Sequence, residues 1–209
     1  MSIVTPRDYS LIAPVYDHVF NRPLSEGHRR IGALLKNKRS GKDMKVLEVG
    51  VGSGLTLDYL PNSIEFTGVD INQNMLSLAH EKAKRFKRKN ITLSIMDAHK
   101  LTYKSNTFDL VLAASVITAV SDPHSAMKEM IRVTKKGGQI AVIANVRNDS
   151  FRSKFIRHFD PITKKFLGFR TDIDSTFFTK FKDIRLIEKE NVNNLLGFPL
   201  SSYHLFEKI

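Results

Sequence analysis

Residues 46–54 constrain the fold more than any other part of the chain, because they read Val-Leu-Glu-Val-Gly-Val-Gly-Ser-Gly. The apolar run before the first glycine is typical of a buried parallel strand. Gly50, Gly52 and Gly54 then allow a sharp turn and a close approach to a ligand, since they carry no Cβ. Asp70 ends the next apolar run, where its carboxylate is suited to accept hydrogen bonds from two ribose hydroxyls. The arrangement predicts a nucleoside-binding site.

The spacing of the glycines distinguishes between kinds of nucleotide. A dinucleotide-binding turn has its third glycine at the position that Leu55 occupies, and the chain has no Gly-Lys-Ser/Thr sequence for a triphosphate. Glu48 places an acid beside the turn. A carboxylate there favours a ligand with a positively charged amino acid tail over one with a pyrophosphate.

The rest of the chain alternates between strand and helix patterns. Such alternation predicts an α/β fold with a mostly parallel, doubly wound sheet of seven strands and helices on both faces. Besides the first two strands, we expect a short helix over 55–60, a helix over 72–89, strands over 91–96 and 108–114, a helix from Asp122 to about Lys135 that Gly137 and Gly138 stop, and strands over 139–146, 183–189 and 201–207.

Composition narrows the functional classes. The chain of 209 residues is the size of one domain, and with no cysteine it has neither disulfides nor thiolate metal sites. Its seven histidines are scattered, so we expect no metal. The longest uncharged apolar run, 110–120, is too short to span a bilayer, which predicts a cytoplasmic protein. The net charge of +12 indicates an anionic partner, either nucleic acid or a lipid surface.

Two segments depart from the alternating pattern. Residues 1–40 have apolar residues at helical spacing, which predicts an N-terminal helical cap. Residues 147–182 hold eight of the fourteen phenylalanines and nine Lys or Arg, but no glutamate. This insert is either a lid that packs its aromatic rings on the sheet or an interfacial segment with rings among acyl chains and cations at phosphates. The basic run at 82–89 is interpreted as a solvated helix face.

The motifs resemble those of a known enzyme class. The string from Glu48 to Gly54, with Asp70, Met-Asp-Ala at 96–98 and Phe-Asp at 108–109, is similar to the motifs of class I S-adenosylmethionine (SAM)-dependent methyltransferases, which have a Rossmann-like single domain. The stretches at 9–20, 26–29, 46–57 and 116–123 resemble the bacterial phosphatidylethanolamine N-methyltransferases of the Rhodobacter type. The similarity extends to about residue 150. That family tends to have Asn-His after the fifth strand, where this chain has Asn145-Val146.

The resemblance implies a set of cofactor-binding residues. Glu48 either orders the glycine turn or receives the ligand's ammonium group through water. Asp70 binds the ribose, and Asp97 with the backbone of Ala98 accepts the adenine amine, with a simple turn role for Asp97 as the alternative. The full set is Tyr16, Glu48, Gly50, Gly52, Gly54, Asp70, Ile71, Met75, Asp97, Ala98, Ala114 and Ser115.

The remaining implied roles concern the adenine, the methionine portion and the acceptor. Ile71 and Met75 either flank the adenine or belong to the core. Backbone groups of Ala114 and Ser115 are offered to the methionine portion. Tyr9 and Tyr16 either close over the sulfonium, whose charge an aromatic face attracts, or anchor the first helix. The substrate-binding candidates are Tyr9, Asn145 and Arg147, and no catalytic side chain is predicted.

The resemblance implies SAM-dependent N-methylation of phosphatidylethanolamine-type head groups, at an anionic phospholipid surface on the inner membrane face, with S-adenosylhomocysteine as product. Quinone-ring methyltransferases share the Tyr-Asp near the N-terminus, so a quinone or a soluble small molecule is the alternative acceptor. A third reading is a nucleic-acid-binding protein with a methyltransferase fold. The charge favours it, but no stacking platform or arginine-glycine motif does, so nucleic acid is not the expected partner.

Overall fold

The computed structural model describes residues 25–36, 44–61, 63–87, 89–145, 173–174, 176–195 and 198–209. An α-helix over 25–36 comes first. The elements that follow are β1 (Lys45–Val49), the 3-10 helix η1 (Leu55–Tyr59), β2 (Glu65–Asp70), α2 (Gln73–Arg85), β3 (Ile91–Ile95), β4 (Phe108–Ala114), α3 (Pro123–Val133), β5 (Thr134–Ala144), the 3-10 helix η3 (Phe177–Lys180), β6 (Ile184–Leu195) and β7 (Phe198–Lys208).

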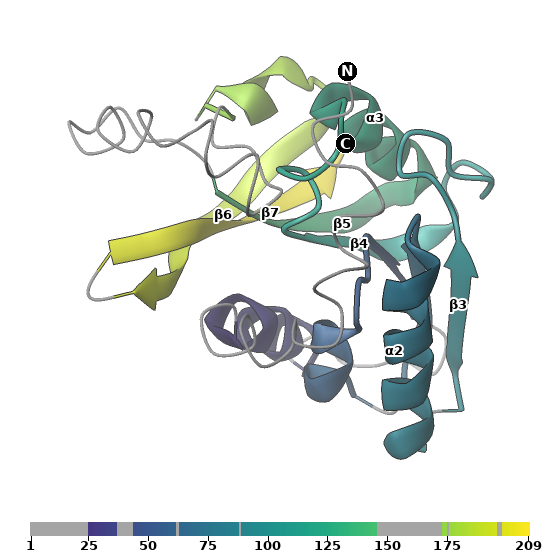
Figure 1. Cartoon of the computed structure of the whole chain (residues 1–209). Coiled ribbons are helices and arrows are strands. Elements are labelled where there is room, and N and C mark those ends of the chain that lie inside the picture. Colours follow the sequence, from purple (N-terminus) through teal and green to yellow (C-terminus); the bar gives the residue numbers. More distant parts are fainter. Residues whose placement is uncertain are drawn as a thin grey trace.

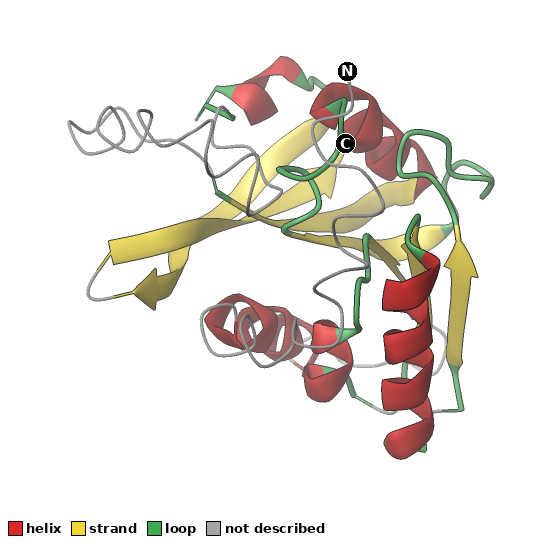
Figure 2. Ribbon diagram, viewed as in Figure 1, coloured by secondary structure: helices red, strands yellow, loops and turns green. Residues whose placement is uncertain are grey.

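The strands form one sheet of seven in the order β3-β2-β1-β4-β5-β7-β6. Neighbours from β3 to β5 are parallel, whereas β7 runs antiparallel to both β5 and β6. Helices cover both faces, with α3 and η3 on one side and the helix over 25–36, η1 and α2 on the other (Figures 1 and 2). The predicted α/β fold, with a mostly parallel seven-stranded sheet and helices on both faces, is confirmed.

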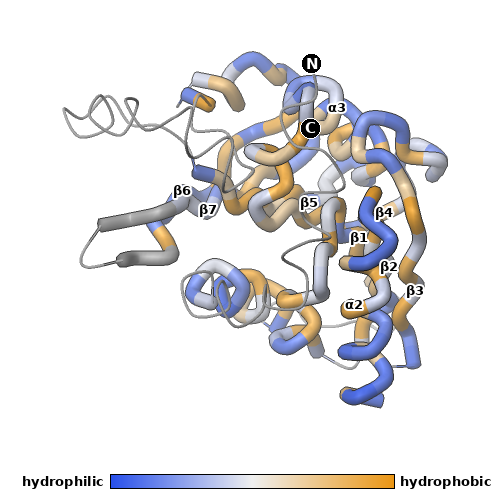
Figure 3. Tube along the Cα trace, in the orientation of Figure 1, coloured by the Kyte–Doolittle hydropathy of each residue, from blue (hydrophilic) through white to orange (hydrophobic). Residues whose placement is uncertain are grey.

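Two hydrophobic clusters hold these layers together, one on each face of the sheet. Met127 and Met130 of α3 pack on one face, and Ile31 and Leu35 of the helix over 25–36 pack on the other. Figure 3 shows hydrophobic residues along the central strands. Most of β4 is buried because both of its faces are covered, which explains its unbroken apolar run.

Side-chain caps fix where the two long helices begin. Asn72 accepts hydrogen bonds from the backbone of Asn74 and Met75, and Asp122 does the same for the first turn of α3, with Pro123 as its first residue. Each cap satisfies backbone N–H groups that have no partner within the helix. The predicted start of each helix is confirmed by its cap.

The end of α3 differs from the prediction. The helix ends at Val133 rather than near Lys135, because the chain passes directly into β5 at Thr134. The Thr134 hydroxyl donates to the carbonyl of Met130 at 2.7 Å and closes the last turn. Gly137, with a φ of 71°, and Gly138 therefore lie inside β5 rather than stopping the helix. The β4–β5 register shifts between Phe108 and Leu110, which accommodates them.

The β6–β7 hairpin extends beyond the predicted strands of 183–189 and 201–207. Its pairing continues to Leu195 opposite Phe198. The sequence at this end reads Asn-Asn before the turn and has Pro199 after it, which are turn signals. Pro199 is tolerated there because pairing of β7 with β5 reaches only Ser202, so within the described part of the chain β7 pairs on one edge alone at residue 199.

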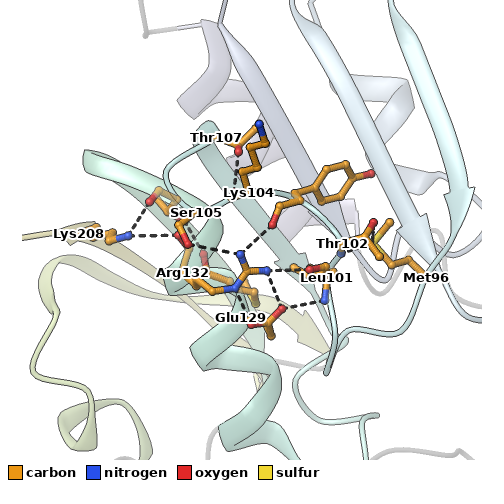
Figure 4. A network of polar contacts seen from close by, with 12 residues as sticks. Met96, Leu101, Thr102, Lys104, Ser105, Thr107, Glu129, Arg132 and Lys208 are labelled. Carbon is orange, nitrogen blue, oxygen red and sulfur yellow. Dashed lines mark hydrogen bonds and ion pairs between the residues drawn. The ribbon is translucent and has the colours of Figure 1, made fainter.

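A polar network joins α3 to the loop that follows β3 (Figure 4). The Arg132 guanidinium donates to both carboxylate oxygens of Glu129, at 2.7 and 2.8 Å, and to the carbonyls of Leu101 and Tyr103, each at 2.7 Å. Glu129 also accepts from the backbone N–H of Leu101 at 2.8 Å. The pair therefore satisfies three backbone groups of a segment without regular structure.

The described end of the 147–182 insert packs into the core. Phe178 and Phe181 are buried, and Phe177 packs against the same cluster, with its ring 5.1 Å from that of Phe178. The ring of Phe178 also lies 5.0 Å from that of Phe206 on β7. These three rings pack on the sheet, and the choice between a lid and an interfacial segment stays open for the rest of the insert. The other five lie outside the described residues, as do residues 1–24 of the predicted cap.

The basic run at the end of α2 is not solvated throughout. Lys82 is buried, and its ammonium lies 3.8 Å from the carboxylate of Asp58 on η1. Lys84, Arg85, Lys87 and Lys89 are exposed, as expected for a solvated face. The prediction was wrong for Lys82 because η1 packs against α2 at that point.

Candidate functional site

The glycine turn leaves the end of β1 with three residues in the left-handed region, at φ of 71° for Gly50, 54° for Gly52 and 79° for Gly54. A Cβ on Gly50 would lie 2.4 Å from Val116, and one on Gly54 would lie 2.8 Å from Leu57. A Cβ on Gly52 would meet nothing nearer than the Met75 methyl at 3.5 Å. Protein packing thus explains two of the glycines, while Gly52 faces open space that a ligand can fill.

Asp70 holds the turn against the end of β2. Its carboxylate accepts hydrogen bonds from the backbone N–H of Gly52 at 2.8 Å and of Asn72 at 2.9 Å. Burial raises its pKa, while these backbone donors act in the opposite direction. Each carboxylate oxygen has a second lone pair, so the group can still accept from ligand hydroxyls.

Glu48 is a buried carboxylate beneath the turn. Its Oε1 accepts from the Thr56 hydroxyl at 2.7 Å, and among the described residues nothing hydrogen-bonds its Oε2. Burial raises the pKa of Glu48 to about 8, the nearby charge of Asp70 adds to the rise and the Thr56 bond opposes it. A buried acceptor without a partner is costly, and a cationic ligand group would satisfy it.

A small pocket opens at this place, on the carboxyl edge of the parallel strands. Its lining includes predicted residues from the glycine turn and from the end of β4. The lining residues are His28, Glu48, Gly50, Val51, Gly52, Ser53, Leu55, Ala114 and Ser115.

Ser115 has an unusual backbone for a residue with a side chain, with a φ of 65°. Its N–H donates to the carbonyl of Ile143 at 2.8 Å, and its own carbonyl accepts from the Thr118 hydroxyl at 3.0 Å. The Ser115 N–H is already used, because an N–H makes only one good hydrogen bond. Of the two backbone groups predicted to bind the cofactor, the carbonyl is therefore the one that remains.

The residues predicted to contact adenine lie near the ends of β2 and β3. Ile71 is 54% exposed, whereas Met75 is 3% exposed and borders the open side of Gly52. Ala98 is partly buried against the core. Sequence reasoning missed Ile95, which is 57% exposed at the end of β3 and pairs with Asp70 in the sheet.

Asp97 already has a protein partner. One of its oxygens accepts from the backbone N–H of His99 at 2.9 Å and lies 2.6 Å from the ring Nδ1 of the same residue. Partial burial raises the pKa of Asp97, but the His99 contacts outweigh it and the net pKa is lowered. The turn role is thus present in the structure, and its other oxygen is left for a ligand.

Several predicted residues that the structure describes are not among those lining this pocket: Gly54, Asp70, Ile71, Met75, Asp97, Ala98 and the partly buried Asn145. Tyr9, Tyr16 and Arg147 lie outside the described residues. Conversely, His28 lines the pocket although the sequence reasoning missed it. The available signal was its helical spacing from the buried Ile31 and Leu35, which places all three on one face.

Comparison with known proteins agrees with this geometry. A sequence-family model described as "Methyltransferase domain" matches residues 47–142. A phosphatidylethanolamine N-methyltransferase of Cereibacter sphaeroides is 36% identical over 136 residues, which span 65% of each chain. A demethylmenaquinone methyltransferase of Staphylococcus aureus is 32% identical over 142 residues, or 66% of this chain and 58% of the relative. The chain thus spans less than two thirds of the length of these curated relatives.

Solved structures match over more of the chain. A SAM-dependent methyltransferase of Thermotoga maritima superimposes with a TM-score of 0.70 at 18% identity, over 98% of this chain and 100% of that chain. The cyclase SpnF gives a TM-score of 0.70 at 22% identity, over 92% of this chain and 75% of that chain. At these identities the likeness shows the fold. Residues 47–142 thus match a methyltransferase domain, the solved structures share its fold, and both findings support SAM as the cofactor.

The pocket fits such a cofactor on its own chemistry. The unpaired buried oxygen of Glu48 suits the ammonium of the methionine portion, and the open side of Gly52 leaves space for the ligand's approach. The carboxylate of Asp70 at the end of the neighbouring strand suits ribose hydroxyls. Among the described residues, no group of three His, Cys, Asp or Glu side chains could hold a metal ion.

Proposed function

We propose that the protein transfers the methyl group of SAM to the amine of a phosphatidylethanolamine-type phospholipid. The observation that carries the cofactor assignment is the buried Glu48 carboxylate, with one unpaired oxygen, beside a glycine turn that Asp70 holds. In this assignment Glu48 faces the methionine ammonium, Asp70 the ribose, and Asp97 and Ala98 the adenine amine. Ile71 and Met75 flank the adenine, and Ala114 lines the methionine end.

The main contribution of the protein to methyl transfer is to align the acceptor with the methyl group of SAM. SAM supplies an activated methyl group on a sulfonium, and transfer to the acceptor is an in-line displacement that depends on proximity and orientation. The acceptor amine attacks in its neutral form, which a partly dry pocket favours over the ammonium. A backbone carbonyl or a tyrosine hydroxyl suffices to align the lone pair, so we assign no general base. Loss of the sulfonium charge on transfer favours release of S-adenosylhomocysteine.

The phospholipid acceptor is supported by sequence similarity and charge. The relative that methylates phosphatidylethanolamine shares 36% identity over 136 residues. The net charge of +12 favours an anionic lipid surface, where we propose that the protein binds peripherally. Among the described residues, no helix is long and apolar enough to cross a membrane. Residue 146 is Val where the family tends to have His, a departure that counts against the phospholipid acceptor if that His binds the head group.

A quinone ring is the second candidate acceptor, and demethylmenaquinone methyltransferases at about the same level of similarity favour it. The two acceptors differ in the atom that is methylated, nitrogen or carbon. We also propose that residues 1–209 form one methyltransferase domain, with residues 1–40 as an N-terminal cap and residues 147–182 as an insert.

The test is a methyl-transfer assay with labelled SAM. The acceptors are phosphatidylethanolamine vesicles, demethylmenaquinone in neutral vesicles, and RNA. Label in the lipid head group supports the proposal, and label in the quinone supports the second candidate. Label in RNA alone, or no transfer with measured SAM binding, contradicts both. The Asp70→Ala variant is the control for transfer that does not use this site.

A further inference from the structure

The helix over 25–36 contributes a side chain to the pocket that the glycine turn also lines. His28 is 6% exposed and lines the same pocket as Glu48. Its ring stacks on that of Tyr59, with centroids 6.4 Å apart and an interplanar angle of 22°. Gly32, one turn later, lies so close to Tyr59 that a Cβ there would be 2.8 Å from the Tyr59 Cβ. Tight packing against η1 therefore fixes where His28 lies.

An ion-pair cluster ties the same helix to the far edge of the sheet. Arg30 bonds to Glu190 on β6 at 3.0 Å and also to Glu188. Its guanidinium carbon lies 4.8 Å from the ring centre of the buried Tyr203, a cation–π geometry. Arg30 thus fixes the helix on the side away from η1.

The charged side chains in the pocket lining determine where the ligand's positive and negative groups bind. Among the described residues that line the pocket, Glu48 is the one acid and His28 is the one whose side chain can carry a positive charge. The methionine portion of SAM is a zwitterion, with an ammonium and a carboxylate on one carbon. An ammonium beside Glu48 would favour the ionised form of its carboxyl group, whereas a second carboxylate would oppose it, so the zwitterion is favoured with its ammonium toward Glu48 and its carboxylate toward a donor.

We propose that His28 donates a ring N–H to the α-carboxylate of the cofactor, and that Arg30 is a positioning residue that holds His28 in place. This inference rests on the proposed function, since it assigns one further contact to the same cofactor. It gives the helix over 25–36 a role in cofactor recognition. Glu48 binds the ammonium of the methionine portion and His28 binds its carboxylate, from two different elements of the chain.

The experiment compares two ligands by calorimetry. S-adenosylhomocysteine has the amino acid portion, and 5′-methylthioadenosine shares the adenosine but lacks that portion. His28→Phe keeps the ring stacking on Tyr59 and removes the donor, so it should weaken S-adenosylhomocysteine about ten- to hundredfold, as for a hydrogen bond to a charged group. Its affinity for methylthioadenosine should not change. His28→Gln, which keeps an N–H, should retain most of the affinity.

Two neighbouring arginines provide the matched control. Arg30→Met should weaken S-adenosylhomocysteine about fivefold and leave methylthioadenosine unchanged, as expected for loss of a partly exposed ion pair. Arg29 is exposed on the same helix, and Arg29→Met should change neither ligand. If His28→Phe does not fold, the Arg30→Met and Arg29→Met variants provide the comparison between S-adenosylhomocysteine and methylthioadenosine.

Two results would overturn the inference. One is equal loss of both ligands in the His28 and Arg30 variants, which would indicate a merely structural role. The other is no loss of either ligand. If the unaltered protein binds methylthioadenosine and S-adenosylhomocysteine but the variants match it, only this inference fails. If the unaltered protein binds neither ligand, the proposed function fails with it.

Discussion

At the scale of single residues, Glu48 makes a pH-dependent prediction. Burial raises its pKa to about 8 in the folded protein, against an ordinary value of 4.5. The folded state therefore binds the proton more tightly than the unfolded state, so stability falls as pH rises from about 4.5 to about 8. Glu48→Gln removes this penalty, and its gain over the unaltered protein should be absent at pH 4 and reach a few kcal/mol at pH 9.

Urea unfolding of both proteins at pH 4, 7 and 9 measures this difference. Other titrating groups are common to both proteins and cancel in the comparison. A constant difference across the three pH values would mean that the pKa of Glu48 is the same in the folded and the unfolded state.

Asp70 makes a prediction about cofactor affinity. Asp70→Ala removes acceptors for the proposed ribose hydroxyls and for the N–H of Gly52, so it should cost roughly 2–4 kcal/mol of SAM affinity. Asp109 is the matched control, because its carboxylate also accepts from a backbone N–H, that of Lys45 at 2.9 Å, but at the amino edge of the sheet. Calorimetry should show unchanged affinity for Asp109→Ala. Unchanged affinity for Asp70→Ala would remove Asp70 from the site.

Sequence reasoning identified Glu48, the glycine turn and Asp70 because their order along the chain reflects strand ends that meet at one edge of the sheet. It did not identify what these groups touch. The bonds from Gly52 and Asn72 to Asp70, and from His99 to Asp97, depend on loop conformation, which no periodicity encodes. These contacts, and the placement of His28, needed the structure.

At the scale of elements, the glycine turn can be tested against a second glycine with similar backbone. Gly52 and Gly137 both have positive φ, and a Cβ on either meets no protein atom closer than 3.5 Å. Each Gly→Ala change should therefore cost about 1 kcal/mol of stability from the left-handed backbone. Gly52→Ala should also weaken SAM binding, and Gly137→Ala, in β5 at the amino edge, should not. Thermal melts and calorimetry check both effects, and equal SAM affinity would show that the ligand does not pass Gly52.

The Arg132 network in Figure 4 predicts a stability effect without a binding effect. Arg132→Met leaves the carbonyls of Leu101 and Tyr103 without their charged donor and separates Glu129 from its partner. Each lost bond to a charged group is worth about 1.5–3 kcal/mol, discounted here because Arg132 is a third exposed. We expect a loss of about 2 kcal/mol in urea unfolding. Arg85→Met is the control, because Arg85 is exposed on α2. An equal loss of unfolding free energy in the two variants would contradict the role of the network.

The elements themselves followed from apolar periodicity and caps, and their ends were the least predictable part. α3 passes into β5 without the break that Gly137 and Gly138 suggested, because the register shift absorbs them. The hairpin continues through Asn-Asn and Pro199 because at that end, of the strands that the structure describes, β7 pairs with β6 alone. In both cases the pairing partner overrode the local turn signal.

At the scale of the whole molecule, the fold and the acceptor are separate questions. The cyclase SpnF superimposes as well as a methyltransferase does, with a TM-score of 0.70 for each, so this sheet accommodates different chemistry. The likeness of the sheet therefore does not decide which acceptor is methylated, and the acceptor has to be identified by assay.

Membrane binding is the last prediction. The protein should sediment with vesicles rich in anionic lipid and not with neutral ones, since each cation near such a surface contributes about 1 kcal/mol. The insert has nine Lys or Arg between 147 and 182, so four engaged cations would suffice for recruitment. Raising the salt concentration should release the protein, because exposed charges are screened beyond about 10 Å at 0.1 M.

The apolar part of that binding is separable by substitution. Phe151→Ser with Phe155→Ser should weaken vesicle binding by the same factor at low and high salt, since that contribution is apolar burial. Phe86→Ser is the control: Phe86 is 43% exposed at the end of α2, away from the carboxyl edge of the sheet, and its loss should not change binding. Equal sedimentation with neutral and anionic vesicles, or equal effects of the two changes, would contradict the lipid surface. A soluble acceptor would then be the better account of the same cofactor site.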